Sequence, residues 1–321
     1  MYNEIKLEKG MYHLSGKSFT QALEESDPSA QYAGSPLARL DAYERQLKRF
    51  DIRVSGKDCD CVEKFFTTTE SAVLFPEFIR RAVLQGMEEA ILPDMIGVVT
   101  HCVSNRYQPI ELTETAPYST VAQGIALPAS SIMESSGVVQ LQKYGRAINA
   151  SYEAVRQQRL DIFAVMLRRI GTELANSMIG EVLNVMKTDA PTIHTAGSFL
   201  HYNDLMNLFV QFDSYKMRAL YVSPENLALI LAMLPFNHDV APDAALHLPF
   251  GPRLYNCPQL DDETLIGADT DFAIEQILSS DVVLETDKLI DCQLDCITVS
   301  VNTGFRKIMD DALCVLKVDS L

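Results

Sequence analysis

The spacing of hydrophobic positions changes several times along this chain of 321 residues. Apolar side chains recur at helical intervals over residues 76–91 and again over the long stretch 151–187. Gly171 and Gly180 weaken the second pattern, and a break is expected near Gln158. The pattern therefore predicts one short amphipathic helix and one long helix.

Short extended runs separate these two helices. They cover residues 98–103, 109–112, 120–127 and 138–141, with turn-forming residues between them. Their apolar content is too thin to build a core without other contacts. The segment therefore predicts a long β-hairpin that lies against another surface, for which a neighbouring subunit is a candidate.

Helices and strands alternate after residue 191. Helices are expected over 202–212 and 223–234, and strands over 218–222, 253–256, 264–267, 272–277 and 282–285. Ser223 has the position of an N-cap, with Pro224 in the first turn. Two alternating runs, 292–301 and 312–318, close the chain, with a turn expected at residues 302–304. The whole pattern predicts an α+β fold.

The first 64 residues show mixed charge and little sustained apolar periodicity. One short helical stretch is expected near residues 37–50. We interpret this segment as an N-terminal arm without a core of its own, which becomes ordered by contact with adjacent subunits.

The formal net charge of -16 argues against a general nucleic-acid binder, because neutralising phosphates requires clustered lysine and arginine. No lysine or arginine occurs between Leu254 and Asp287, whereas acidic residues accumulate there. We expect that stretch to lie on an outer or axial surface, away from DNA.

The sequence offers little support for catalysis, a cofactor or a metal site. Gly10 to Ser18 ends like a phosphate-binding loop, but one residue too many separates its glycines. The six histidines are dispersed, and the seven cysteines form no Cys-x-x-Cys pair. The longest strongly apolar run, residues 227–236, is too short to cross a membrane. We expect no catalytic, cofactor-binding or metal-binding residues, and no membrane partner.

A set of short motifs resembles the tailed-phage major capsid protein family, which has the Hong Kong 97 fold. The motifs are Val121-Ala122-Gln123 through Pro128, Tyr144-Gly145-Arg146, Ser151-Tyr152-Glu153, Arg159-Leu160-Asp161, Tyr221-Val222-Ser223-Pro224 and Gly304-Phe305-Arg306-Lys307. Each is weak by itself, but their order matches the family over residues 70–321.

The resemblance implies a Hong Kong 97-type α+β architecture in six segments. They are an N-terminal arm (1–64), the first part of a peripheral domain (65–103), an extended β-hairpin loop (104–137), the peripheral domain with its spine helix (138–190), an axial domain (191–288) and closing strands of the peripheral domain (289–321).

The resemblance also implies a function in assembly. Such a major capsid protein forms pentamers and hexamers of an icosahedral phage head around double-stranded DNA, which it contacts non-specifically. Expected partners are copies of itself, a portal, and scaffold or decoration proteins; the expected location is the virion, after assembly in the host cytoplasm. Residues expected to contact neighbouring subunits are Pro117, Tyr118, Leu127, Pro128, Arg146, Arg159, Phe305 and Arg306.

The best-known type of family member joins a loop lysine to a neighbour's asparagine by an isopeptide bond. Here Leu127 occupies the matching position, and no lysine lies between Lys64 and Lys143. We therefore expect a shell without such crosslinks. Two alternatives remain open: an encapsulin-like nanocompartment shell, against which the long arm argues, and a soluble α/β enzyme with an unrecognised site.

Overall fold

A computed structural model of the chain describes residues 5–13, 17–114, 120–233, 246–280, 282–289 and 294–319. The chain divides into two compact units. Unit 1 comprises Met1–Ala90, Gly145–Ala175 and Val282–Ser300, and unit 2 comprises Ile91–Tyr144, Asn176–Asp281 and Val301–Leu321. The division into arm, extended loop, peripheral domain and axial domain stays a prediction.

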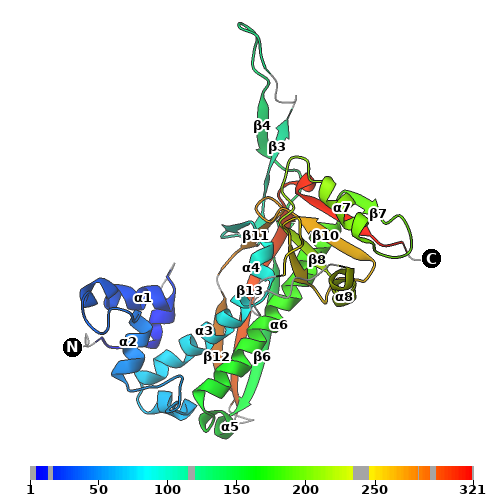
Figure 1. Cartoon of the computed structure of the whole chain (residues 1–321). Helices are drawn as coiled ribbons and strands as arrows, with labels where there is room; N and C mark the ends of the chain where they lie inside the picture. The colour runs from blue at the N-terminus through cyan, green and yellow to red at the C-terminus, as the bar shows by residue number, and fades with distance from the viewer. Residues whose placement is uncertain are drawn as a thin grey trace. The chain divides into compact units, whose positions relative to one another are not determined.

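Unit 1 is mainly helical (Figure 1). Its elements are η1 (Lys9–His13), α1 (Phe19–Ser26), η2 (Ser29–Tyr32), α2 (Ala42–Arg49), η3 (Val62–Phe66), η4 (Ser71–Leu74), α3 (Phe75–Glu88), most of β6 (Gln142–Ser151), α5 (Tyr152–Arg156), the first half of α6 (Leu160–Lys187), β12 (Val283–Leu289) and the start of β13 (Leu294–Lys307). The gap between α5 and α6 confirms the predicted break near Gln158.

The described part of the first 64 residues has a core, so the expectation that it has none is wrong. Phe19, Leu23 and Leu47 are buried, and capping boxes begin both α1 and α2. Arg45 is fully buried and donates from Nε to Asp27 at 2.8 Å. This core was hard to predict because each short helix contributes only a few apolar positions. The buried Arg45–Asp27 ion pair fills another part of the interior with charged residues, which do not appear in a hydrophobic pattern.

A close crossing of α3 and α6 forms the centre of unit 1. A methyl group on Gly171 would clash with the Val83 carbonyl oxygen, and one on Gly86 would clash with the Arg168 carbonyl oxygen. The Thr172 hydroxyl donates to the Gly86 carbonyl oxygen at 3.0 Å. Glycine is an unfavourable residue inside a helix, but at position 171 the missing side chain allows α3 to approach the α6 backbone.

Unit 2 contains most of the β-structure. Its elements are α4 (Leu92–Met95), β1 (Val98–His101), β2 (Arg106–Tyr107), β3 (Ile110–Glu114), β4 (Ser130–Glu134), β5 (Val139–Gln140), β7 (Thr192–His194), α7 (Tyr202–Val210), β8 (Ala219–Val222), α8 (Pro224–Met233), β9 (Arg253–Asn256), β10 (Thr264–Ala268), β11 (Ile274–Leu278), η6 (Asp310–Ala312), β14 (Leu313–Lys317) and the remainders of α6 and β13. The Ser223 side chain accepts from the Asn226 N–H at 3.3 Å, which confirms the predicted N-cap of α8.

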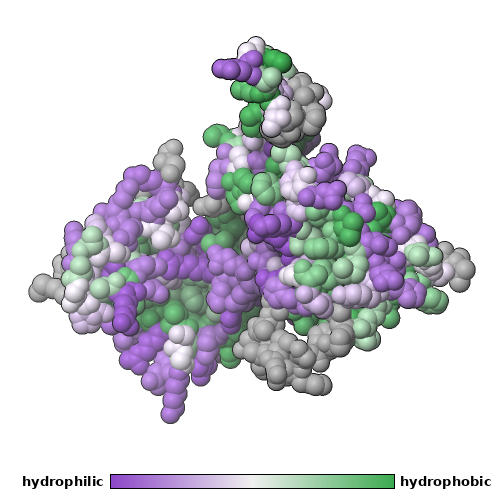
Figure 2. Space-filling model, turned by 45° about the horizontal axis from the view of Figure 1, so that its top comes forward, coloured by the Kyte–Doolittle hydropathy of each residue, from purple (hydrophilic) through white to green (hydrophobic). Residues whose placement is uncertain are grey.

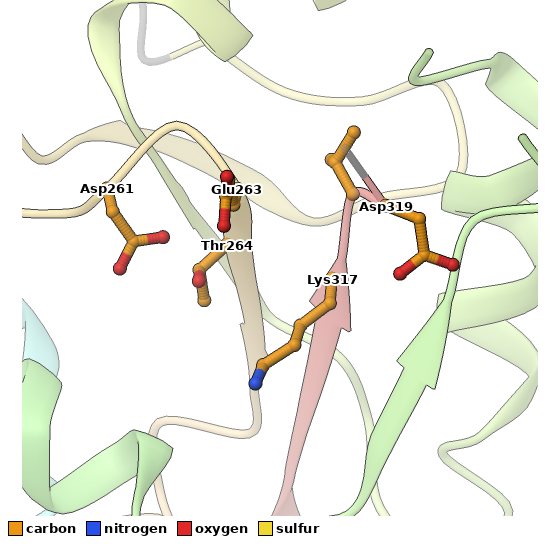
Figure 3. A pocket seen from close by; sticks show the side chains of 6 residues that line it. Asp261, Glu263, Thr264, Lys317 and Asp319 are labelled. Carbon is orange, nitrogen blue, oxygen red and sulfur yellow. The ribbon is translucent and has the colours of Figure 1, made fainter. Parts of the chain in front are cut away.

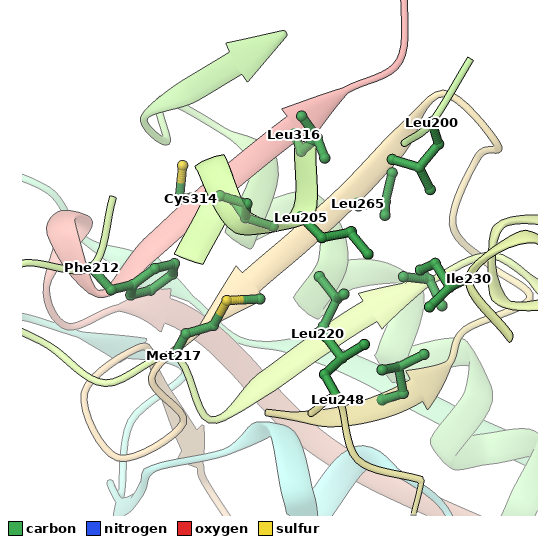
Figure 4. Packing of buried hydrophobic residues seen from close by; sticks show 13 residues of the cluster. Leu200, Leu205, Phe212, Met217, Leu220, Ile230, Leu248, Leu265, Cys314 and Leu316 are labelled. Atoms are coloured by element: carbon green, nitrogen blue, oxygen red, sulfur yellow. The ribbon is translucent and has the colours of Figure 1, made fainter. Parts of the chain in front are cut away.

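One mixed sheet of unit 2 has the strand order β7-β14-β10-β8-β9. Its strands and the adjoining helices α7 and α8 bury a shared apolar cluster, shown in Figure 4. Leu205, Leu220 and Leu265 bring α7, β8 and β10 together there, and Ile230 adds α8. Burial of these side chains gives the unit a core of its own.

The second sheet runs β1-β11-β13-β12, with β6 also paired to β13. The turn predicted at residues 302–304 is wrong, because β13 continues through these positions. Gly304 pairs with Ile277 of β11, and the Thr303 hydroxyl donates to the Ile277 carbonyl oxygen at 3.0 Å. Pairing with β11 thus overrides the turn preference of the local sequence.

The predicted hairpin exists, but one of its strands was misplaced. Residues 120–127 form no strand, and the partner of β3 is β4, at Ser130–Glu134. Among the described residues, no helix is both long enough and apolar enough to cross a membrane.

Candidate functional site

The β3–β4 hairpin carries exposed apolar side chains, three of which share one of its faces. Leu112 lies opposite Ile132 in the antiparallel register, so these two side chains share a face with Ile110, two residues before Leu112. The exposed fractions are 42% for Leu112, 67% for Ile132 and 56% for Ile110. Figure 2 shows apolar side chains on this projecting hairpin. We name Ile110, Leu112 and Ile132 the hairpin face.

The charges of the hairpin are all of one sign. Between Tyr107 and Gln142 the sequence has glutamates at 111, 114 and 134 and neither lysine nor arginine. The hairpin face is therefore an apolar strip with acidic neighbours, which suits a partner surface with apolar and cationic side chains.

The base of the hairpin is held by hydrogen bonds around Ser135, which is buried. Its N–H donates to the Pro109 carbonyl oxygen at 2.9 Å, and its carbonyl oxygen accepts from the Gln108 side chain at 2.5 Å. Its hydroxyl donates to Glu111. The β2–β5 ribbon then continues toward the sheet, with Tyr107 opposite Val139.

The residues expected at subunit contacts differ in how exposed they are. Pro117 and Tyr118 lie outside the described residues. Leu127, Pro128 and Arg146 are exposed, Leu127 at 77%. These three positions are accessible to a partner.

Arg159 is half-exposed and forms an ion pair with Asp161 at 2.7 Å. Phe305 is buried, and Arg306 donates from Nε to Glu275 at 2.5 Å within the same chain. Arg159 thus leaves part of its side chain accessible, whereas Phe305 and Arg306 serve the interior of unit 2.

Sequence reasoning missed a buried carboxylate at the base of the hairpin. Glu275 is 5% exposed and accepts hydrogen bonds from the hydroxyls of Thr100 and Tyr107 and from Arg306. Burial, together with the nearby Glu275 charge, raises the pKa of Tyr107, so its hydroxyl stays a donor at neutral pH. The sequence gives no signal for this role, because the three donors lie 175, 168 and 31 residues away from Glu275.

Glu275 also corrects the expectation for the acidic stretch. Asp261, Asp262 and Glu263 are exposed as expected. Asp269 and Glu275 are buried instead, and each pairs with an arginine: Arg218 at 3.0 Å and Arg306 at 2.5 Å, respectively. The arginines come from outside the stretch, so its own composition did not reveal them.

Helix α6 has an exposed apolar patch in unit 1. Ile162, Val165 and Met166 are about half exposed, and their spacing places them on one side of the helix. The exposed Arg169 lies one turn beyond Val165 and Met166. We name Ile162, Val165 and Met166 the α6 patch.

A shallow pocket of about 310 Å³ lies at the ends of β10 and β14 (Figure 3). Asp261, Glu263, Thr264, Lys317, Val318 and Asp319 line it. Two of its carboxylates have partners outside this set: Asp261 forms an ion pair with Lys187 at 3.2 Å, and Asp319 lies 2.7 Å from His194 Nδ1. No group of three or more potential metal ligands occurs in the described part of the chain. The pocket is therefore a solvated charge cluster.

Comparison with known proteins gives one family match. Residues 135–281 match the family model described as phage capsid protein. No curated protein matches the chain in sequence.

Several solved structures share the fold. The capsid of the native GTA particle has a TM-score of 0.55 and 11% identity, with 74% of this chain and 91% of that chain covered. The SrpI encapsulin of Synechococcus elongatus PCC 7942 has a TM-score of 0.54 and 12% identity, with 71% and 87% covered. The structure of Microbacterium phage Oxtober96 has a TM-score of 0.52 and 11% identity, with 72% and 91% covered.

These identities are low, so the structural likeness establishes the fold. The family match begins just after the hairpin and covers the strands β5 and β6, the long helix α6 and the strands β7 to β11. Residues 135–281 thus resemble phage capsid proteins in sequence, and the chain has the Hong Kong 97 fold.

Proposed function

We propose that the chain is a major capsid protein that self-assembles into the pentamers and hexamers of an icosahedral phage head enclosing double-stranded DNA. The observation that carries the proposal is the hairpin face. A two-stranded ribbon is at best marginally stable by itself in water, and exposed contiguous apolar side chains mark interaction sites. In a shell, neighbouring copies would cover these side chains.

The surface that receives the hairpin in this proposal is the α6 patch of another copy. Both surfaces are apolar at the centre, so burying them against each other removes apolar area from water. Their charges are also complementary in part, because Glu134 lies opposite Ile110 on the hairpin face, whereas Arg159 and Arg169 flank the α6 patch, where they pair with Asp161 and Glu173 of the same chain. Charge complementarity of this kind contributes more to the register in which two subunits bind than to their affinity.

In this proposal the shell is held without isopeptide crosslinks. The whole segment between Lys64 and Lys143 contains no lysine, so the hairpin has no amine nucleophile. Particles boiled in denaturant should run as a single band near 35.8 kDa. A ladder of multimers that survives reducing agent would contradict this part of the proposal.

The exposed Leu127, Pro128, Arg146 and Arg159 are the proposed subunit contacts, together with Pro117 and Tyr118 outside the described residues. Phe305 and Arg306 contribute through the sheet that supports the hairpin. A portal, and scaffold or decoration proteins, are the further partners in this proposal.

A protein nanocompartment is the second candidate, because the SrpI encapsulin shares the fold over 87% of its own length. An encapsulin-like shell would enclose protein and not DNA. The N-terminal core built around Arg45 and Asp27 is equally compatible with both shells.

The test is microscopy of particles purified from cells that produce the full chain together with its neighbouring genes. Closed shells tens of nanometres wide with nuclease-protected DNA would support a phage head. Closed shells without DNA would favour the nanocompartment. A chain that stays monomeric at high concentration would contradict assembly altogether.

A further inference from the structure

The β2–β5 ribbon lies against the face of the sheet that β11 and β13 form. Tyr107 and Val139 are directly opposite in the ribbon, so both side chains point to the same side. Glu275 and Arg306 are opposite in the sheet, and Gly304 precedes Arg306 by two residues on the same side. These two faces meet at two points.

The first point is a hydrogen bond from the Tyr107 hydroxyl to the Glu275 carboxylate at 3.3 Å. Glu275 also accepts from Thr100 and, at 2.5 Å, from the Arg306 guanidinium. The carboxylate is therefore fixed by two groups of the sheet before the ribbon docks. Such a preorganised charged acceptor stabilises a hydrogen bond more than a neutral one does.

The second point is the contact of Val139 with Gly304. A methyl carbon placed on Gly304 would lie 2.9 Å from Val139 Cγ1. The missing side chain thus makes room for β5 to lie directly on β13. Val139 is β-branched and cannot easily rotate away from a larger residue.

We propose that Glu275 and Gly304 are positioning residues that fix the direction in which the β3–β4 hairpin leaves the sheet. The inference rests on the proposed function, because the direction matters only if the hairpin must reach a neighbouring copy. A strand rises about 3.3 Å per residue, so a small tilt at the ribbon becomes a large displacement at the tip. We name the two contacts, Tyr107 with Glu275 and Val139 with Gly304, the seat. A loosened seat would leave every subunit folded, but the hairpins would then leave the sheet in variable directions.

Hydrogen–deuterium exchange of the full chain tests the seat directly. Tyr107→Phe removes one hydroxyl and leaves the Glu275–Arg306 pair intact. We expect the amides of the β2–β5 ribbon, including the Leu141 N–H that donates to Asn105 at 3.1 Å, to exchange about tenfold faster. Tyr202→Phe, which removes the hydroxyl of a partly exposed tyrosine on α7, is the matched control and should leave the ribbon unchanged.

Gly304→Ala tests the second point without altering a hydrogen bond of the seat. Exchange should accelerate in the same ribbon peptides, while β8 and β10 keep their protection. Particles of both variants should show a broader range of diameters than wild-type particles.

If the amide exchange rates of the β2–β5 ribbon are unchanged in both Tyr107→Phe and Gly304→Ala, the proposal that the seat holds the ribbon is wrong. This outcome is distinct from failure of the proposed function, in which the wild-type chain would form no shells whatever the exchange rates. Accelerated exchange with shells of unchanged, uniform diameter would also overturn the inference, because the seat would then not direct the hairpin.

Discussion

The α3–α6 crossing and the β3–β4 hairpin differ in where their surface is covered. At the crossing, backbone approaches backbone through Gly86 and Gly171, and the Phe75, Phe78 and Phe163 rings pack nearby with centroids 6.2–6.5 Å apart. In the hairpin, apolar side chains of similar size are largely exposed. The first region completes its packing within one chain, whereas the second leaves packing to be completed by another. Folding and assembly should therefore respond to different substitutions.

The largest expected effect is on assembly. The double substitution Leu112→Asp and Ile132→Asp places two charges on the hairpin face, and burying them against a neighbour would cost several kcal/mol. We expect shells to disappear from electron micrographs. The circular dichroism spectrum and the melting temperature of the unassembled chain should stay close to wild type.

The matched control places the same charges on the opposite face of the same strands. Thr113 and Ser131 are direct partners in the hairpin register, so Thr113→Asp with Ser131→Asp adds equal charge one residue away. Shells should still form. Equal behaviour of the two double variants would mean that charge alone, and not the hairpin face, controls assembly.

A smaller effect is expected on folding at the crossing. Gly171→Ala inserts a methyl group against the α3 backbone and should destabilise the chain by about 3 kcal/mol, because backbone cannot move aside as a side chain does. Gly180→Ala lies in the same helix with no neighbouring atom within 4 Å, so it should stabilise by up to about 1 kcal/mol. Denaturant unfolding of the unassembled chain measures both, and similar midpoints for the two variants would refute the close crossing.

The smallest expected effect is a pH dependence of folding stability that comes from two buried thiols. Burial raises the pKa of the Cys257 thiol to about 12 and that of Cys314 to about 11, from an ordinary value of 9.0. Because the unfolded thiols lose their protons first, the contribution of these two thiols to stability should be constant below about pH 9 and fall between about pH 9 and 12. Cys257→Ala should reduce the slope in unfolding experiments, whereas removal of the exposed thiol with Cys61→Ala should not.

Much of the fold could be predicted because its signals are local. The long helix, its break near Gln158 and the Ser223 N-cap each depend on neighbouring residues in the sequence. The N-terminal core could not be predicted in the same way, because the Arg45–Asp27 pair and the surrounding apolar side chains come from several short elements. The continuous strand β13 was missed because pairing with β11 decides the conformation of residues 302–304.

In the candidate site, too, local features could be predicted from the sequence and contacts between distant residues could not. The hairpin was predicted from extended runs and turn residues, and the exposure of Leu127 and Pro128 is compatible with its proposed role. Glu275 was missed because Thr100 and Tyr107 are 175 and 168 residues away in sequence. A contact of that sequence separation leaves no pattern in one sequence.

The most direct test of the account is a cryo-electron microscopy reconstruction of particles formed by the full chain. We predict that Ile110, Leu112 and Ile132 are covered by an adjacent copy, with its α6 patch at the contact and no covalent bond between the subunits. A reconstruction in which the hairpin face remains open to solvent in closed shells would contradict the central claim that neighbouring copies complete the packing of this region.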